Sequence, residues 1–172
     1  MSCSGILIAG FGNTLCADDG FGVFVIRSLM REAGLPEELD ILDVGISGVS
    51  FVQTLLKGYG ALVIVDAEKR GQAPGTLYQW SPAADEFIPK DREALIDVHF
   101  AEPRRAIQLA KAINALPDTI HIVGCEPENV DSYVLELSNP VKRAIPEAVA
   151  RVKKLITILS TEHISDSRTW NT

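Results

Sequence analysis

Short apolar runs alternate along the chain with longer segments in which apolar residues recur at helical spacing. Strands are predicted where a short apolar run ends at a turn residue, at residues 5–10, 39–44, 61–67, 76–80 and 119–124. Helices are predicted where apolar residues follow a helical period, at residues 20–33, 49–57, 102–115 and 141–160. The run at 61–67, ALVIVDA, is apolar up to its aspartate, which is typical of a strand covered on both faces.

This alternation predicts βαβ units and an α/β fold of three layers, in which a mostly parallel, twisted sheet carries helices on both faces. We expect a single domain over residues 1–160, followed by a polar, frayed tail over residues 161–172. In sheets of this kind the functional loops leave the C-terminal ends of the strands. The candidate loops are therefore those that follow residues 10, 44, 66 and 124.

The composition is that of an ordinary globular protein, and its charge disfavours some partners. The 172 residues are 47% hydrophobic and carry a net charge of −7, which argues against a nucleic-acid backbone as partner. No apolar run reaches the roughly 20 residues of a membrane helix, and the N-terminus lacks the basic segment of a signal peptide. The three cysteines include no CxxC pair, so we expect a reduced, cytoplasmic protein.

The loop after the first strand, GFGNTLCADDGFG (residues 10–22), combines four glycines with two adjacent aspartates. It lacks the third glycine of the G-x-G-x-x-G dinucleotide motif and the lysine of a P-loop. The charges of Asp18 and Asp19 would also repel a phosphate at the start of the next helix. A phosphate site is therefore a poor interpretation, and one of the two aspartates is expected to cap that helix.

Two further polar residues lie where the predicted topology can bring them to this loop. Asp66 ends the most hydrophobic strand, and His99 lies in an irregular stretch before a helix. Taken alone, Asp66 is equally a loop cap, and His99 is more simply a structural histidine. Taken with the aspartate pair, they offer carboxylate oxygens and an imidazole nitrogen, which suit a borderline divalent ion such as zinc or nickel. Three protein ligands would leave a coordination position open for water or for a substrate group.

These motifs, in this order, resemble the hydrogenase maturation proteases, the endopeptidases that process the large subunit of NiFe hydrogenases. The resemblance rests on G-x-G-N-x-L-x-x-D-D-G-x-G from Gly10 to Gly22, VIVDA at 63–67, PGT at 74–76 and a histidine before a helix. It runs from residue 6 to about residue 158. It implies a twisted sheet with helices on both sides, and one cut that removes the C-terminal extension of the large-subunit precursor after nickel has been installed.

The resemblance also implies the catalytic and metal-binding residues, which fall on Asp19, Asp66 and His99. The chain departs from the family at Asp97, where the family often has Ser or Thr two residues before the histidine. Nickel is expected to arrive with the substrate, with zinc or cadmium able to replace it in crystals. The sequence contains no general-protease motif such as H-E-x-x-H and no sign of a deep side-chain specificity pocket.

Two alternative functions use the same residues. Cys16, near a helix N-terminus, could be the nucleophile of a cysteine hydrolase with His99 as its base. A non-enzymatic nickel-binding chaperone would use the three ligands without cutting, and cleavage of a nickel-loaded precursor separates it from a protease. Structural interpretations are preferred elsewhere: Cys125 as a packing residue, His121 as a sheet residue and Lys69-Arg70 as a solvated loop.

Overall fold

A computed structural model describes residues 5–82 and 103–167 of the chain. The strands are β1 (Ile6–Phe11), β2 (Leu39–Gly45), β3 (Ala61–Ala67), β4 (Leu77–Trp80) and β5 (Thr119–Cys125). The helices are a 3-10 turn η1 (Ala17–Gly20), then α1 (Phe21–Leu29), α2 (Gly48–Leu55), α3 (Pro103–Ala112) and α4 (Asn139–Ser167). Every strand and helix expected from the pattern forms, and α4 runs beyond residue 160, where the sequence predicted its end.

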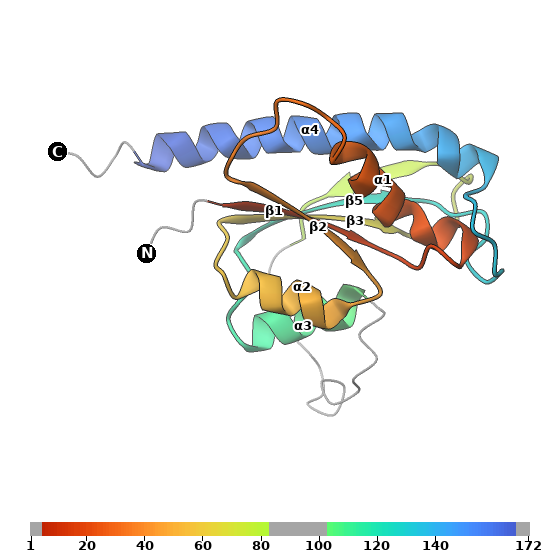
Figure 1. The fold of residues 1–172 in the computed structure, drawn as a ribbon, viewed down its shortest axis with the longest axis horizontal. Helices are drawn as coiled ribbons and strands as arrows, with labels where there is room; N and C mark the ends of the chain where they lie inside the picture. The colour runs from red at the N-terminus through yellow and green to blue at the C-terminus, as the bar shows by residue number, and fades with distance from the viewer. Residues whose placement is uncertain (1–4, 83–102, 168–172) are drawn as a thin grey trace.

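The five strands form one sheet in the order β2-β1-β3-β5-β4. The first four of these pair in parallel, and β4 pairs antiparallel with β5 at the edge. Helices α1 and α4 cover one face of the sheet, and α2 and α3 cover the other (Figure 1). The predicted α/β class, with a mostly parallel sheet between two helical layers, is therefore confirmed.

Two apolar cores lie on opposite faces of the sheet, because successive strand residues point to opposite sides. In β1, Ile6 and Ile8 pack with α1 and α4, while Leu7 belongs to the core beneath α2 and α3. In β3, Val63 faces the first core and Ile64 the second. This alternation decides on which side of the sheet each residue at the strand ends emerges.

Helix α1 lies directly against β1 and β3, and glycines make this approach possible. A Cβ atom on Gly22 would lie 2.2 Å from the carbonyl oxygen of Val65 and 2.4 Å from that of Phe11. A Cβ atom on Gly10 would lie 2.2 Å from a side-chain carbon of Ile26. Two glycines of the 10–22 loop therefore bring the helix close to the sheet, a role unrelated to phosphate binding.

Within the described ranges, no helix combines the length and the apolar character that a membrane span requires.

Substitution of Gly22 by alanine should destabilise the fold, because the added methyl group meets rigid backbone on both neighbouring strands. We expect Gly22→Ala to lose about 1–3 kcal/mol of unfolding free energy or more, measured by urea denaturation. The exposed Gln53 of α2 offers a control, since Gln53→Ala removes no buried contact and should change stability by less than about 0.5 kcal/mol. Equal stability of wild type and Gly22→Ala would contradict this packing.

Candidate active site

The strand order places a switch point between β1 and β3. From β1 the chain passes through α1 to β2 on one side, and β3 then begins on the other side of β1. In open α/β sheets, ligand sites lie outside the C-terminal ends of the strands at such a reversal. Asp19 lies in η1, shortly after β1, and Asp66 is the second-last residue of β3, so both lie at this edge.

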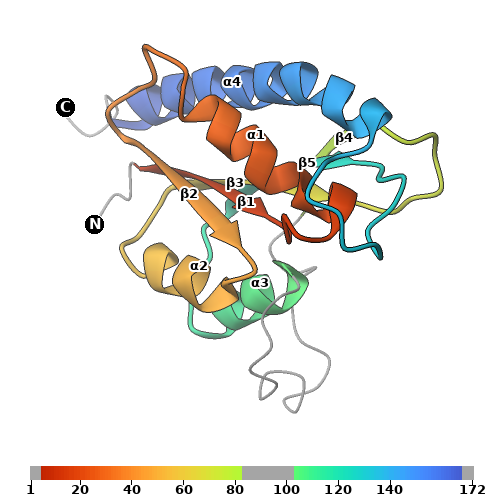
Figure 2. The same ribbon diagram turned by 45° about the vertical axis from the view of Figure 1, so that its right-hand side comes forward.

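The two adjacent aspartates have different surroundings. Asp18 is fully buried, and its carboxylate accepts main-chain hydrogen bonds from Glu128 (2.8 Å), Asn129 (3.1 Å) and Ser138 (2.6 Å). Asp18 thus fastens the loop after β5 to the loop after β1, and the two segments lie side by side in Figure 2. The prediction that one aspartate caps the following helix is wrong, because neither η1 nor α1 has a side-chain cap.

Ala17 turns the chain so that the aspartates separate. Its φ of 49° lies in the left-handed region, which costs a non-glycine residue on the order of 1 kcal/mol or more. Hydrogen bonds hold it there: the Ala17 N–H donates to Val134 (2.7 Å), and the Asp18 N–H donates to Asn129 (3.0 Å). The turn directs Asp18 inward and leaves Asp19 at the edge of the sheet.

Asp19 is positioned by its own loop. One carboxylate oxygen accepts the N–H of Asn13 at 2.6 Å. Gly12 allows this closure, because its φ is 125° and a Cβ atom there would lie 1.8 Å from the Asp19 carbonyl oxygen. The shape of the loop therefore depends on a glycine whose role is close approach rather than flexibility.

Asp66 is held against ionisation. Burial raises its pKa well above the usual range, and the negative charge of Asp19 raises it further. A hydrogen bond from the Ala67 N–H acts in the opposite direction. The structure thus brings Asp19 and Asp66 together, and a positive ion between them would relieve both their repulsion and the cost of burying the charge.

His99 lies outside the described residues, so the structure does not test the prediction that it joins Asp19 and Asp66. Among residues 5–82 and 103–167, no group of three or more His, Cys, Asp and Glu side chains is arranged to hold a metal ion. Pro103, four residues after His99 in the sequence, lines the same cavity as Asp66.

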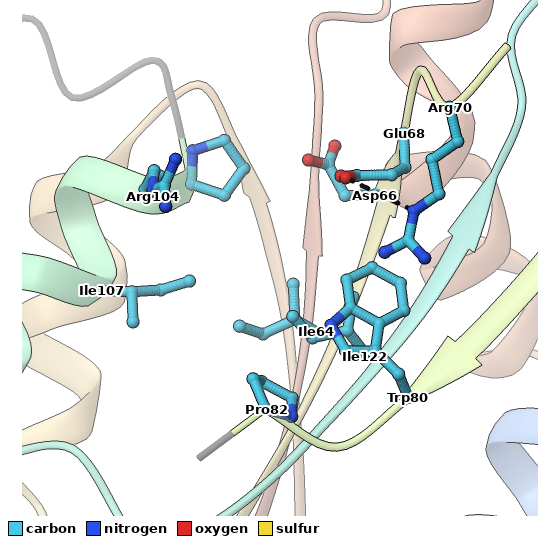
Figure 3. A pocket seen from close by; sticks show the side chains of 10 residues that line it. Ile64, Asp66, Glu68, Arg70, Trp80, Pro82, Arg104, Ile107 and Ile122 are labelled. Atoms are coloured by element: carbon cyan, nitrogen blue, oxygen red, sulfur yellow. Dashed lines mark ion pairs between the residues drawn. The ribbon is translucent and has the colours of Figure 1, made fainter. Parts of the chain in front are cut away.

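That cavity has a volume of about 450 Å³ and lies between the sheet and α3. Figure 3 shows Asp66 and Glu68 on one side of it and Arg104 on the other. The remaining labelled lining residues are Ile64, Arg70, Trp80, Pro82, Ile107 and Ile122. The sequence offered no sign of a deep side-chain specificity pocket, and it could not reveal this cavity, because the cavity is assembled from segments far apart in the chain.

Arg70 forms part of the cavity wall rather than a simple solvated loop. Its guanidinium carbon lies 3.9 Å from the centre of the Trp80 ring and 4.8 Å from that of Tyr78, in cation–π contact with both. Its Nε lies 3.6 Å from a carboxylate oxygen of Glu68. Lys69 does point to solvent, where it pairs with Asp131. A period of two from Ile64 through 66, 68 and 70 is the sequence signal that was missed.

Glu126 supports this wall of the cavity through hydrogen bonds. Its buried carboxylate accepts the N–H groups of Arg70 (2.8 Å) and Gly71 (3.1 Å) and the hydroxyl of Tyr78. The Tyr78 hydrogen bond, helped by these N–H donors against the effect of burial, lowers the pKa of Glu126 to about 2. Burial and the Glu126 contact raise the pKa of Tyr78 to about 12.

Gly124 leaves space for the same wall. A Cβ atom there would lie 3.1 Å from the Glu68 side chain and 3.4 Å from the Trp80 ring. The wall beside Asp66 is therefore built by β3, β4 and β5 together, and it is held through backbone and side-chain contacts.

The other candidates have structural surroundings. Cys125 is buried in the core, and burial raises the pKa of its thiol to about 12, which confirms it as a packing residue. His121 lies within β5, with Nδ1 2.7 Å from the Ser81 hydroxyl. Asp43, near the C-terminal end of β2, pairs with Arg27 at 3.0 Å. Cys16 is half-buried, and its backbone forms an isolated β-bridge with that of Val134.

Comparison with known proteins points to one family. The hydrogenase maturation protease (HycI) profile matches residues 23–155, a range that includes Asp66 and His99 and begins after Asp19. Hydrogenase expression/formation protein HupD of Rhizobium leguminosarum bv. viciae is 28% identical over 152 residues, which cover 88% of this chain and 73% of that protein.

Two solved structures share the fold. The hydrogenase maturating endopeptidase HybD from E. coli matches with a TM-score of 0.70 and 26% identity, over 86% of this chain and 89% of that one. The hydrogenase 2 maturation peptidase from Thaumarchaeota archaeon SCGC_AB-539-E09 matches with a TM-score of 0.67 and 28% identity, over 88% of this chain and 97% of that one.

Replacement of Asp18 should cost far more stability than replacement of its neighbour. The amide of Asp18→Asn cannot accept all three main-chain hydrogen bonds, so we expect a loss of about 3 kcal/mol or more of unfolding free energy. Asp19→Asn keeps the side-chain shape and an acceptor for Asn13, so its change should stay within about 1 kcal/mol. Urea unfolding followed by circular dichroism measures both, and equal losses would contradict this division of roles.

Glu126 should make stability depend on pH in the acid range. Its pKa is about 2 in the fold against 4.5 ordinarily, so between these values the unfolded chain binds a proton that the folded chain does not. The stabilisation is complete above about pH 4.5 and is lost as the pH falls towards 2. We expect Glu126→Gln to flatten this part of the stability–pH curve in urea titrations. Asp131→Asn, at an exposed carboxylate, is the control; an unchanged slope in Glu126→Gln would refute the assignment.

Proposed function

The chain belongs to the hydrogenase maturation protease family, and we propose that it removes the C-terminal extension from a nickel-loaded large-subunit precursor of a NiFe hydrogenase. The family match and the solved structures support a maturation peptidase. One observation carries the finer proposal: Asp19 and Asp66 meet at the β1–β3 switch point, where the Asp66 carboxyl is held back from ionising. We place the reaction in the cytoplasm, with the precursor protein as partner.

In this proposal nickel belongs to the substrate, and Asp19, Asp66 and His99 join its coordination sphere when the precursor binds. Two neighbouring carboxylates repel each other, and a divalent cation between them removes that repulsion. Carboxylate oxygens and an imidazole nitrogen are suitable ligands for nickel, and zinc or cadmium can serve as probes of the same site. The part of His99 in this set is supported by the family resemblance.

Binding of the nickel-loaded precursor is then coupled to loss of a proton. Burial and Asp19 favour the protonated form of Asp66, and a metal ligand must be deprotonated, so precursor binding weakens as the pH falls. Nickel beside the scissile bond polarises a carbonyl oxygen or makes a bound water more acidic, and either effect assists amide hydrolysis.

This arrangement explains how a processing protease spares other cytoplasmic peptides. A peptide without the metal brings no cation to offset the repulsion between the two carboxylates. A peptide that carries nickel gains several strong ligand contacts at once. Recognition is therefore expected to depend on the metal more than on any single side chain of the precursor.

The central prediction is that nickel-loaded precursor is cut and apo-precursor is not. Purified enzyme is incubated with both forms, and loss of the extension is followed by mass spectrometry. Asp19→Asn should lower the cleavage rate by at least about tenfold while the protein stays folded, because the amide keeps the shape and loses the charge. Equal cutting of both precursors would refute metal-dependent recognition.

One variant, with a control, and one measurement on the wild type separate this proposal from its alternatives. Cys16→Ser should cut nearly as fast as wild type, and a complete loss of activity in the folded variant would favour the cysteine hydrolase. Asp43→Asn removes a carboxylate near the same sheet edge that pairs with Arg27, and it should also retain activity. Retention of nickel-loaded precursor without any cutting by wild type would favour the chaperone.

A further inference from the structure

We propose that the cavity beside Asp66 binds an apolar side chain of the precursor, from a residue that adjoins the bond to be cut. This inference rests on the proposed function, and it adds a specificity subsite of defined chemistry to the metal-binding edge. Its basis is one cavity that combines the carboxylate of Asp66, an apolar floor and the guanidinium group of Arg104.

The cavity is continuous with the candidate active site, because Asp66 lines it. In the sheet register Asp66 pairs with Gly124, and two residues deeper Ile64 pairs with Ile122. The cavity therefore runs from the carboxylate at the sheet edge towards an apolar floor, which Ile107 of α3 completes (Figure 3). A side chain that enters from the edge would leave its own peptide group next to Asp66.

The floor is apolar, and the described residues cover it only in part. Ile64 and Ile107 are buried, while Ile122 and Trp80 remain half-buried at the cavity. Binding sites for organic groups commonly combine such apolar lining with a few polar groups at the rim, and covering apolar surface is favourable in proportion to its area. An apolar side chain is the occupant that this floor favours.

The rim matches a main-chain peptide group. Carboxylates of Asp66 and Glu68 lie on the β3 side, and Arg104 lies on the α3 side (Figure 3). Within the described part of the chain, no ion pair or hydrogen bond is found for Arg104. A peptide offers an N–H in one direction and a C=O in the other, so an extended segment can donate to the carboxylates and accept from Arg104. We therefore take the occupant to be an extended stretch of the precursor.

The test varies the size of the side chains beside the cut in the precursor and the size of residue 122 in the enzyme. Mass spectrometry of the product first locates the cut, and the residues on either side are then replaced in nickel-loaded precursor by alanine, phenylalanine and aspartate. At one of these two positions, aspartate should lower kcat/KM for the wild-type enzyme roughly tenfold or more. Ile122→Phe, which fills the cavity, should shift preference there towards alanine, and Ile122→Ala should shift it towards phenylalanine.

Ile158→Phe is the matched control, because Ile158 lies half-exposed on α4, across the sheet from this cavity. It should leave the order of preference unchanged. Thermal unfolding of each variant confirms that it is folded. Ile122 variants that change kcat/KM for all precursors by one common factor would overturn the inference, as would polar residues on both sides of the cut.

Arg104→Met tests the rim separately. Because Arg104 is assigned to the main chain, its loss should slow the cutting of every precursor by a similar factor and leave the side-chain preference intact. An unchanged rate would overturn the assignment of the rim. Failure of wild type to cut nickel-loaded precursor would instead refute the proposed function, so the two failures are distinguishable.

Discussion

The geometry of the candidate site depends on one buried carboxylate. Asp18 accepts hydrogen bonds from three main-chain N–H groups of the loop after β5, and this contact joins the ends of two strands that are not neighbours in the sheet. A fully buried carboxylate is stable only when its oxygens are satisfied in this way. Because Asp18 turns inward, Asp19 can stay at the edge. One residue thus stabilises the loop while its neighbour is free for chemistry.

The carboxylate of Asp66, at the end of β3, lies in a less favourable electrostatic environment than that of Asp18. Asp66 is half-buried beside another carboxylate, an arrangement that costs stability unless a proton or a cation is present. The surrounding wall does not relieve it, because Arg70 is engaged with Glu68 and the rings of Trp80 and Tyr78. A positive charge bound at the switch point would therefore be stabilised by these two carboxylates. Functional sites commonly retain such unfavourable local interactions, which the rest of the fold compensates.

Local patterns were sufficient for much of this structure. Apolar runs and helical periods predicted the strands and α-helices that the structure describes, because each buries its apolar side chains in a core on one face of the sheet or on both; they did not predict the 3-10 turn η1. The role of Asp18 could not be predicted in the same way: its partners lie more than 100 residues further along the chain, and the Asp-Gly pattern equally favours a helix cap. The cavity is also a product of tertiary packing between β3, β5 and α3. The place of Arg70 could have been predicted from the sequence, since the period of two that continues β3 places it beside Asp66 and Glu68.

The contacts of Asp18 also have a consequence for the order of events during synthesis. A growing chain carries both Asp19 and Asp66 well before Ser138 leaves the ribosome, so the loop after β1 has no partner for its buried carboxylate until late in translation. Contacts at such long sequence separation form slowly, because a large loop must close first. The candidate site thus acquires its final shape after most of the sheet has been made, and a truncated chain that ends before the loop after β5 would carry the candidate residues without the geometry that they require.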